Sequence, residues 1–181
     1  WAIAHELGHV NQISPGLKWV STTEVTNNVY SVCVRYQFGR DSMPLEQEKC
    51  NDGNNNNVLG GRFNSYLNYG IIKGEQWLCQ KGQDNMDPSK YPYGGDHFVK
   101  LCPLWQLLLY YREIVGGEKR DWYGDVAEIV RNTDESQLTN GQLQLNFMRN
   151  TMDVVKEDLT DFFIKAGMLK PIDKELDDYA R

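Results

Sequence analysis

The chain has 181 residues, of which 40% are hydrophobic and 24% are charged, a composition typical of a globular domain with its own core. The 25 acidic residues outnumber the 19 basic ones and give a formal net charge of −6. This balance, together with the absence of a long basic run, argues against nucleic acid or an anionic membrane surface as a partner. No stretch of about 18 uninterrupted apolar residues occurs, so we expect no membrane span in this chain.

Hydrophobic periodicity predicts that the first part of the chain is helical. The first predicted helix covers residues 1–13 and ends before Pro15, which cannot continue it. A second helix is predicted from about 22 to 38, where apolar residues recur at helical spacing. The polar segment 39–57 ends in a run of four asparagines and is predicted to be a loop. Trp1 lies inside a helical pattern with no helix start signal before it, so we expect this chain to be the C-terminal part of a larger protein.

The second part of the chain also shows helical patterns. We find no internal repeat and no convincing alternating strands, so the predicted fold class is mainly α. Aromatic residues in apolar runs are more typical of a core than of a sugar-binding platform, and this applies to Trp19, Trp77 and Trp105. The acidic segment 173–178 is expected to be a solvated face. The predicted helices are 62–72, 97–115, 122–131, 141–156 and 158–166, the last capped by Asp158 or Thr160.

Four cysteines are spread widely along the chain, at Cys33, Cys50, Cys79 and Cys102. None forms a Cys-x-x-Cys pair, which argues against a thiolate zinc site. Disulfides in an extracellular protein and buried free thiols are both compatible with this spacing.

Residues 5–9 have the sequence HELGH, which matches the pattern H-E-x-x-H. Residues four apart on a helix lie on the same face, so the imidazoles of His5 and His9 can bind one Zn²⁺ ion. Glu6 lies beside these two ligands and is the candidate general base, which takes a proton from zinc-activated water and returns it to the leaving amine. This chemistry would hydrolyse a peptide bond.

The alternative interpretation is a chance pair of histidines on a surface helix. The apolar neighbours Ile3, Leu7 and Val10 argue against a solvated charged face at this segment. The chain has only three histidines, and two of them fall in this pattern. We therefore favour the zinc site.

A catalytic zinc site needs a third protein ligand and an open fourth position. The compact metzincin pattern would place its glycine and third histidine at positions that hold Gln12 and Pro15, which excludes it. The remaining pattern is a glutamate on the following helix, and the best candidate is Glu24. Glu46 and Glu48 compete for this role, but they lie in a loop-like segment that would place them less accurately.

Polar residues follow Glu24 at helical spacing, at Asn27, Asn28 and Ser31. Two adjacent asparagines are unfavourable inside a helix unless their amides have partners. We expect Asn27 and Asn28 to hydrogen-bond the metal ligands and so orient them. The alternative is a polar stripe that faces solvent.

Peptide hydrolysis also needs a donor for the developing oxyanion. His97 is the one histidine left over, and Tyr91 and Tyr93 lie in the Gly- and Pro-containing loop before it. These three residues are the candidate donors. The alternative is that His97 only begins the apolar helix and that the tyrosines contact substrate or solvent.

Two motifs together resemble the enhancin-like zinc metallopeptidase family, namely residues 5–12 (HELGHVNQ) and residues 24–28 (EVTNN). Later segments are similar to the same family, at 104–107 (LWQL) with Tyr110 and at 158–163 (DLTDFF) with Gly167. The resemblance covers most of the chain, and the first two motifs in combination are specific.

The resemblance implies a gluzincin, a zincin-like metallopeptidase in which His5, His9 and Glu24 bind one zinc ion and Glu6 is the base. Residues 1–181 would then be the C-terminal part of the peptidase domain. This part would hold an active-site helix, a third-ligand helix and a helical subdomain. An N-terminal sheet subdomain, which aligns the substrate in gluzincins, would be missing, so activity of this part alone is not implied. The three expected parts are 1–13, about 22–38 and about 58–181.

The resemblance further implies a secreted or cell-surface endopeptidase, of bacterial type, that cleaves mucins and other O-glycosylated proteins. It also implies carbohydrate-binding modules elsewhere in the full-length protein. One alternative is a general gluzincin peptidase or aminopeptidase that acts on unglycosylated peptides. Another is a non-catalytic glycoprotein-binding module that keeps its zinc for structure. The intact Glu6 argues against the last alternative, because a structural site has no use for a base.

Overall fold

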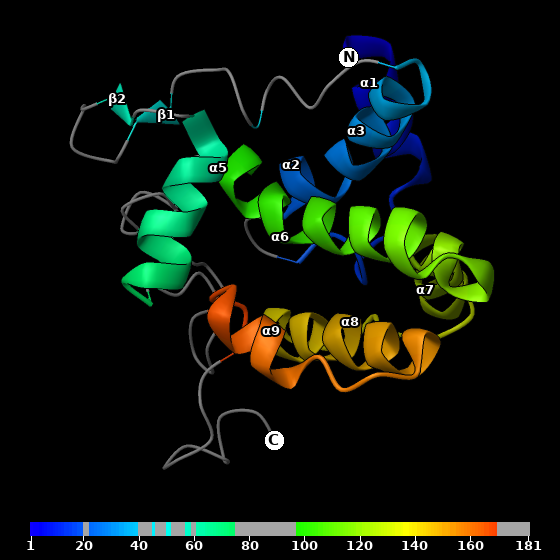
Figure 1. The fold of residues 1–181 in the computed structure, drawn as a ribbon. Coiled ribbons are helices and arrows are strands. Elements are labelled where there is room, and N and C mark those ends of the chain that lie inside the picture. The colour runs from blue at the N-terminus through cyan, green and yellow to red at the C-terminus, as the bar shows by residue number, and fades with distance from the viewer. Residues whose placement is uncertain are drawn as a thin grey trace.

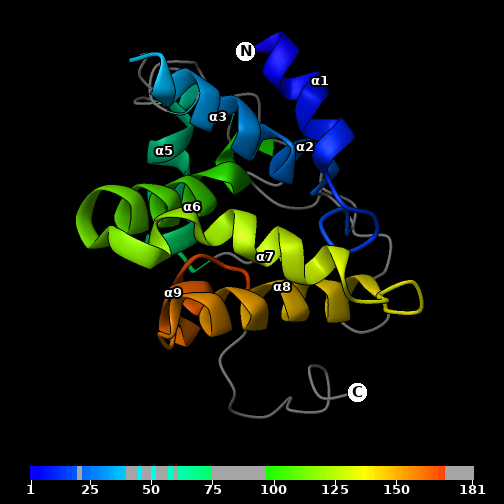
Figure 2. The same cartoon turned by 90° about the vertical axis from the view of Figure 1, so that its right-hand side faces the viewer.

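The computed structural model describes residues 1–19, 22–39, 45, 50–51, 57–58, 61–74 and 97–169. In this part the chain is mainly helical, which confirms the predicted fold class. Figure 1 shows the helices in three tiers, with α1 to α3 at the top, α6 and α7 in the middle, and α8 and α9 at the bottom. Figure 2 shows the same order from the side. None of the helices described is long and apolar enough to cross a membrane.

The top tier contains the two segments that carry the predicted site. Helix α1 spans Ala2–Asn11, slightly less than the predicted 1–13. The helix predicted from 22 to 38 is divided into α2 (Thr23–Thr26) and α3 (Asn28–Gln37), with the break at Asn27. Glu24 therefore lies on the short helix α2, and Asn27 joins it to α3 with helical backbone angles (φ −64°, ψ −36°).

A glycine allows α1 to lie directly on the segment between α2 and α3. Ala4 and Gly8 are the buried residues of α1. A Cβ atom added at Gly8 would lie 2.3 Å from the backbone oxygen of Asn27, a separation that only glycine can accommodate without moving the backbone. The close approach of two backbones therefore positions the histidines of α1 against the beginning of α3.

Two strands of two residues each occur largely within the segment predicted to be a loop. β1 (Cys50–Asn51) pairs antiparallel with β2 (Asn57–Val58), with Cys50 opposite Val58. Residues 50–51 and 57–58, at the end of the predicted loop 39–57, are therefore paired. Strands of two residues are too short to show the alternation of apolar and polar residues by which a strand is recognised in sequence.

The remaining helices follow the predicted ranges to within a few residues. A pair of glycines ends the long apolar helix as predicted, because Gly116 and Gly117 both have positive φ angles of 66° and 61°. Helix α8 begins with a capping box between Thr139 and Gln142. The N-cap of α9 is Leu159 and not the predicted Asp158 or Thr160, although the backbone N–H of Thr160, the first residue of α9, donates to Oδ1 of Asp158 at 2.9 Å. These helices are α5 (Gly61–Ser65), the π-helix η1 (Tyr66–Ile72), α6 (His97–Leu109), the π-helix η3 (Tyr110–Val115), the 3₁₀-helix η4 (Gly117–Asp121), α7 (Trp122–Arg131), α8 (Asn140–Val155) and α9 (Thr160–Lys165).

Large aromatic side chains fill the core between the tiers. Trp122 on α7 and Phe147 on α8 are buried, with ring centroids 6.5 Å apart. Trp19, from the loop after α1, packs on Phe147 at 5.3 Å. Trp19 and Trp105 are buried, which confirms the predicted core role of both. Trp77 and the acidic segment 173–178 lie outside the described residues.

Two cysteines in the described part are free thiols, Cys33 and Cys102. Burial raises the pKa of the Cys33 thiol to about 11, so this group stays protonated and weakly nucleophilic at neutral pH. The side chains of Cys50 and Cys79 lie outside the described residues.

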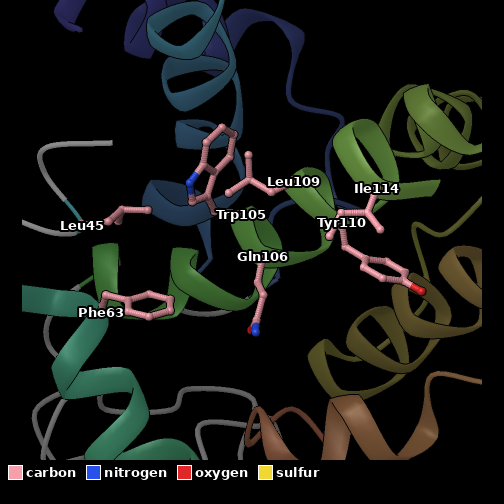
Figure 3. A pocket seen from close by; sticks show the side chains of 7 residues that line it. All are labelled: Leu45, Phe63, Trp105, Gln106, Leu109, Tyr110 and Ile114. Carbon is pink, nitrogen blue, oxygen red and sulfur yellow. The ribbon is translucent and has the colours of Figure 1, made fainter. Parts of the chain in front are cut away.

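An apolar cavity of about 360 Å³ lies between α5, α6 and η3 (Figure 3). Its walls include Trp105, Gln106 and Tyr110, which belong to the segment that resembles the enhancin-like family. Leu45, Phe63, Leu109 and Ile114 complete the lining. None of these residues was predicted to take part in the metal site.

Candidate metal centre

His5, His9 and Glu24 converge where α1 meets α2. The Glu24 carboxylate lies with Oε2 3.3 Å from Nε2 of His5 and Oε1 3.4 Å from Nε2 of His9. One ligand atom from each residue lies within 4.8 Å of the others. The two imidazole side chains are 23% and 26% exposed and the carboxylate is 41% exposed. The three groups are therefore held by the protein on one side and open to solvent on the other.

The spacing of the two histidines on α1 brings their rings together. His5 and His9 are four residues apart, and their ring centroids lie 4.8 Å apart with the planes at 86°. Glu24 reaches them from the first turn of α2. Two helices therefore supply the three candidate ligands.

Asn28 holds His5 through an amide whose orientation is fixed. Its Nδ2 donates to the backbone oxygen of Glu24 at 2.8 Å, and a carbonyl oxygen can only accept. The amide oxygen Oδ1 must therefore face His5, whose Nδ1 lies 2.9 Å away. The acceptor Oδ1 of Asn28 lies closer to Nδ1 of His5 than the donor Nδ2 of Asn27 does, at 2.9 against 3.2 Å. This arrangement favours the tautomer with the proton on Nδ1 and the lone pair of Nε2 towards Glu24.

Asn27 forms the floor of the site. Its side chain is fully buried, and its Nδ2 lies 3.1 Å from Nε2 of His9, 3.2 Å from Nδ1 of His5 and 3.5 Å from Nε2 of His5. Within the described part of the chain its Oδ1 is buried with no hydrogen-bond partner. The structure thus places both predicted asparagines against the histidines, on the protein side of the site.

Gln12 contacts the site, although the sequence patterns did not single it out as a functional residue. Its Oε1 lies 3.4 Å from Nδ1 of His9. Gln12 entered the prediction as a mismatch to the metzincin pattern and as the last residue of the family-like motif at residues 5–12, with no role assigned to it. A usable signal was present, because position 12 lies three residues after His9 and residues at this spacing are neighbours on a helix.

Glu6 lies at the edge of the site rather than within it. Its side chain is 77% exposed, and its Oε1 lies 4.0 Å from Nε2 of His5. Glu6 is not one of the three residues whose ligand atoms converge. It is therefore free to contact a molecule that approaches from solvent.

The apolar residues around the motif lie on the solvent face of α1, which corrects the expectation that they help to bury it. Ile3 and Val10 are each 80% exposed, and Leu7 is 56% exposed. The contact with α3 is made instead by the small residues Ala4 and Gly8. The physical reason is the close approach of the two backbones, which leaves no room for large side chains on the buried face.

Of the three candidate oxyanion donors, His97 lies within the described residues. His97 is the first residue of α6, and the next residue, Phe98, packs edge-on against the ring of Trp1 at 5.5 Å. The beginning of α6 therefore lies beside the beginning of α1. His97 is not one of the residues whose ligand atoms converge. The candidate donors Tyr91 and Tyr93 lie outside the described residues, as do the competing ligands Glu46 and Glu48.

A family model described as Peptidase M60, enhancin and enhancin-like, matches residues 1–167. The chain belongs to this family. The match confirms the resemblance that the sequence motifs indicated, and it assigns the enhancin-like chain to the metallopeptidases. No curated protein matches the chain.

The donor set of this enhancin-like chain suits a zinc ion. Two atoms bound at about 2.05 Å to a tetrahedral ion lie about 3.3 Å apart. Each imidazole has a different carboxylate oxygen of Glu24 at this distance, Oε2 at 3.3 Å from His5 and Oε1 at 3.4 Å from His9, and one ligand atom from each of the three residues lies within 4.8 Å of the others. Two imidazoles and a carboxylate form one of the ligand sets found in catalytic zinc sites, which keep one position open. His5, His9 and Glu24 are therefore suitable ligands for a zinc ion.

Proposed function

We propose that His5, His9 and Glu24 bind one Zn²⁺ ion and that the protein is an endopeptidase of the gluzincin type. The observation that carries this proposal is the convergence of two Nε2 atoms and one carboxylate. A zinc ion bound there would supply a Lewis acid that polarises the scissile carbonyl and acidifies water. The zincin-like arrangement predicted for the fold belongs to this proposal.

In this proposal Glu6 is the general base. Its carboxylate removes the proton from the attacking water and then donates it to the nitrogen of the departing amine. Two features support the role, namely that Glu6 lies next to His5 without joining the ligands and that its side chain is 77% exposed. A buried carboxylate at this position would not reach a substrate.

His97 is our proposed donor to the oxyanion, and Tyr91 and Tyr93 are the alternative donors. The support is the contact between Trp1 and Phe98, which brings the start of α6 to the start of α1. A donor near that point would face the end of α1 that carries His5.

For the substrate we propose mucin-like, O-glycosylated proteins, cleaved by a secreted or cell-surface bacterial enzyme. Membership of the enhancin-like family supports this class of substrate. A gluzincin that acts on unglycosylated peptides is the alternative. Cleavage of a mucin should be compared with cleavage of the same mucin after enzymatic removal of its O-glycans. Faster cleavage of the deglycosylated form would contradict the proposed substrate.

The decisive test replaces the base without touching the metal ligands. In the full-length protein, Glu6→Gln should bind zinc normally but lose about 10²–10⁴-fold in kcat. Glu118→Gln provides the matched control, because Glu118 is an exposed glutamate on η4. A chelator should abolish cleavage by the unmodified protein. Retention of full activity in Glu6→Gln, or in the presence of chelator, would contradict the proposed mechanism.

A further inference from the structure

We infer that Gln12 is a positioning residue that fixes His9 and the helix of Glu24 relative to each other. The inference rests on the proposed zinc site. Gln12 follows the end of α1, and only 5% of its surface is exposed. A buried carboxamide is costly unless its donors and acceptor have partners. The partners of Gln12 show what it does.

Backbone carbonyls determine which way the Gln12 amide points. Its Nε2 lies 3.2 Å from the backbone oxygen of Leu17 and 2.9 Å from that of Thr23. Both oxygens can only accept, so the NH₂ group must be on this side. The amide oxygen Oε1 is then on the other side, where Nδ1 of His9 lies 3.4 Å away.

This orientation sets the tautomer of His9. Because Oε1 of Gln12 can only accept, the proton of the neutral ring lies on Nδ1, and Nε2 is left free to bind a metal. The donor Nδ2 of Asn27, 3.1 Å from Nε2 of His9, is compatible with this tautomer. Carbonyl or carboxylate partners on the second ring nitrogen are what orient histidine ligands in metal sites.

The same side chain joins α1 to α2. Through Nε2, Gln12 also contacts the hydroxyl of Thr26, which itself donates to the backbone oxygen of Leu17. Thr23 and Thr26 are the first and last residues of α2, the helix that carries Glu24. Gln12 therefore connects one candidate ligand on α1 with the helix of the third ligand.

The arrangement is repeated for the other histidine. Asn28 binds the backbone oxygen of Glu24 through Nδ2 and holds His5 through Oδ1. Gln12 binds the backbone oxygen of Thr23 and holds His9 in the same way. Adjacent carbonyls of α2 thus orient the two carboxamides that orient the two histidines.

The test measures zinc affinity and protein stability separately. Gln12→Met keeps the approximate size of the side chain but removes its donors and acceptor. We expect zinc affinity, measured by competition with a chromophoric chelator, to fall about tenfold. In the zinc-free protein, long-range ¹⁵N correlation spectra of the neutral imidazoles should show that His9 loses its Nδ1-protonated preference while His5 keeps it.

Thr26→Val is the matched control. It removes another buried hydrogen-bonding group from the same cluster but leaves the contact between Gln12 and His9 in place. We expect a loss of stability similar to that of Gln12→Met and zinc affinity within about twofold of the unmodified protein. Unchanged affinity in Gln12→Met, or an equal loss of affinity in Thr26→Val, would overturn the inference.

If Gln12→Met does not fold, a second variant tests the positioning role of Gln12. Gln12→Glu keeps an acceptor for His9 but cannot donate to the carbonyls of Leu17 and Thr23. It should lower both stability and zinc affinity, because the link to α2 is lost, while His9 keeps its Nδ1-protonated preference. Zinc affinity equal to that of the unmodified protein would overturn the inference. Failure of the unmodified protein to bind zinc would contradict the proposed function. Normal zinc binding by both the unmodified protein and the Gln12 variants would contradict only the role of Gln12.

Discussion

The contact of α1 with α3, which carries the metal site, and the contact of α7 with α8 are held together by different forces. In the first, Gly8 of α1 lies on Asn27 at the start of α3, and the carboxamide side chains of Gln12 and Asn28 donate to backbone carbonyls of α2. In the second, the rings of Trp122 and Phe147 lie in an apolar core. One contact consists of close backbones and directed hydrogen bonds, whereas the other consists of large buried rings.

The free energy of unfolding and the orientation of the metal ligands therefore depend on different contacts. A buried aromatic ring contributes several kcal/mol through burial and packing, whereas one hydrogen bond contributes about 1 kcal/mol net. Directed hydrogen bonds, however, fix the orientation of ligands, which packing alone does not. We therefore expect changes at the contact of α7 with α8 to affect mainly stability. Changes at the contacts of α1 with α2 and α3 should affect mainly zinc binding.

The largest effect on stability is expected at the aromatic contact between α7 and α8. Trp122→Ala should lower the free energy of unfolding by about 3–5 kcal/mol, because it removes a fully buried ring. Urea unfolding of the zinc-free protein measures this. Ile129→Ala on the same helix is the control, since Ile129 is 36% exposed, and it should cost about 1 kcal/mol or less. Equal losses in the two variants would contradict the comparison.

A smaller effect, on both properties, is expected at the contact of α1 with α3. Gly8→Ala places a Cβ 2.3 Å from the backbone oxygen of Asn27, so the helices must separate. We expect a loss of about 1–3 kcal/mol in stability and weaker zinc binding. Gly124→Ala on α7 is the control, because an added Cβ there meets no atom within 4 Å. This change should stabilise the helix by up to about 1 kcal/mol, and stabilisation by Gly8→Ala would refute the close approach.

Asn28→Ala should separate function from stability. We expect zinc affinity to fall about 10–100-fold, because His5 loses the acceptor that orients it, while the free energy of unfolding changes by about 1 kcal/mol. Asn132→Ala is the control, since its Nδ2 also donates to the carbonyl four residues earlier but at an exposed helix end. Calorimetric zinc titration distinguishes them, and equal affinities in the two variants would contradict the role of Asn28.

The smallest effect concerns the pH dependence of a part-buried contact between Lys119 on η4, Tyr111 on η3 and Glu157, which follows α8. Hydrogen bonds from Lys119 and Tyr111 hold the pKa of Glu157 below its usual range. A depressed pKa means that the stabilisation is present above the unfolded value near 4.5 and is lost as the pH falls through the lower folded value. The Tm difference between the unmodified protein and Glu157→Gln should therefore shrink between pH 6 and pH 3. A constant difference over that range would contradict the assignment.

Much of the fold and of the candidate site could be predicted from the sequence, for physical reasons that differ by residue. His5 and His9 were found because a helix places residues four apart on one face. Glu24 was chosen because it begins the next helix. The helix ranges followed from apolar periodicity and from glycine pairs such as Gly116-Gly117, whose positive φ angles end a helix.

The parts that could not be predicted depend on contacts between distant backbones. The role of Gln12 depends on the carbonyls of Leu17 and Thr23, which no local pattern brings into reach. The exposure of Ile3 and Val10 depends on which face of α1 meets α3. The close approach at Gly8 determines that face, and a glycine in sequence does not identify its neighbour.

The central claim is that His5, His9 and Glu24 bind one zinc ion. Its most direct test is an anomalous difference map from crystals of the protein grown with zinc, with data collected on both sides of the zinc absorption edge. We predict one strong peak bounded by Nε2 of His5, Nε2 of His9 and the carboxylate of Glu24. The absence of a peak at this position in zinc-saturated crystals would contradict the claim.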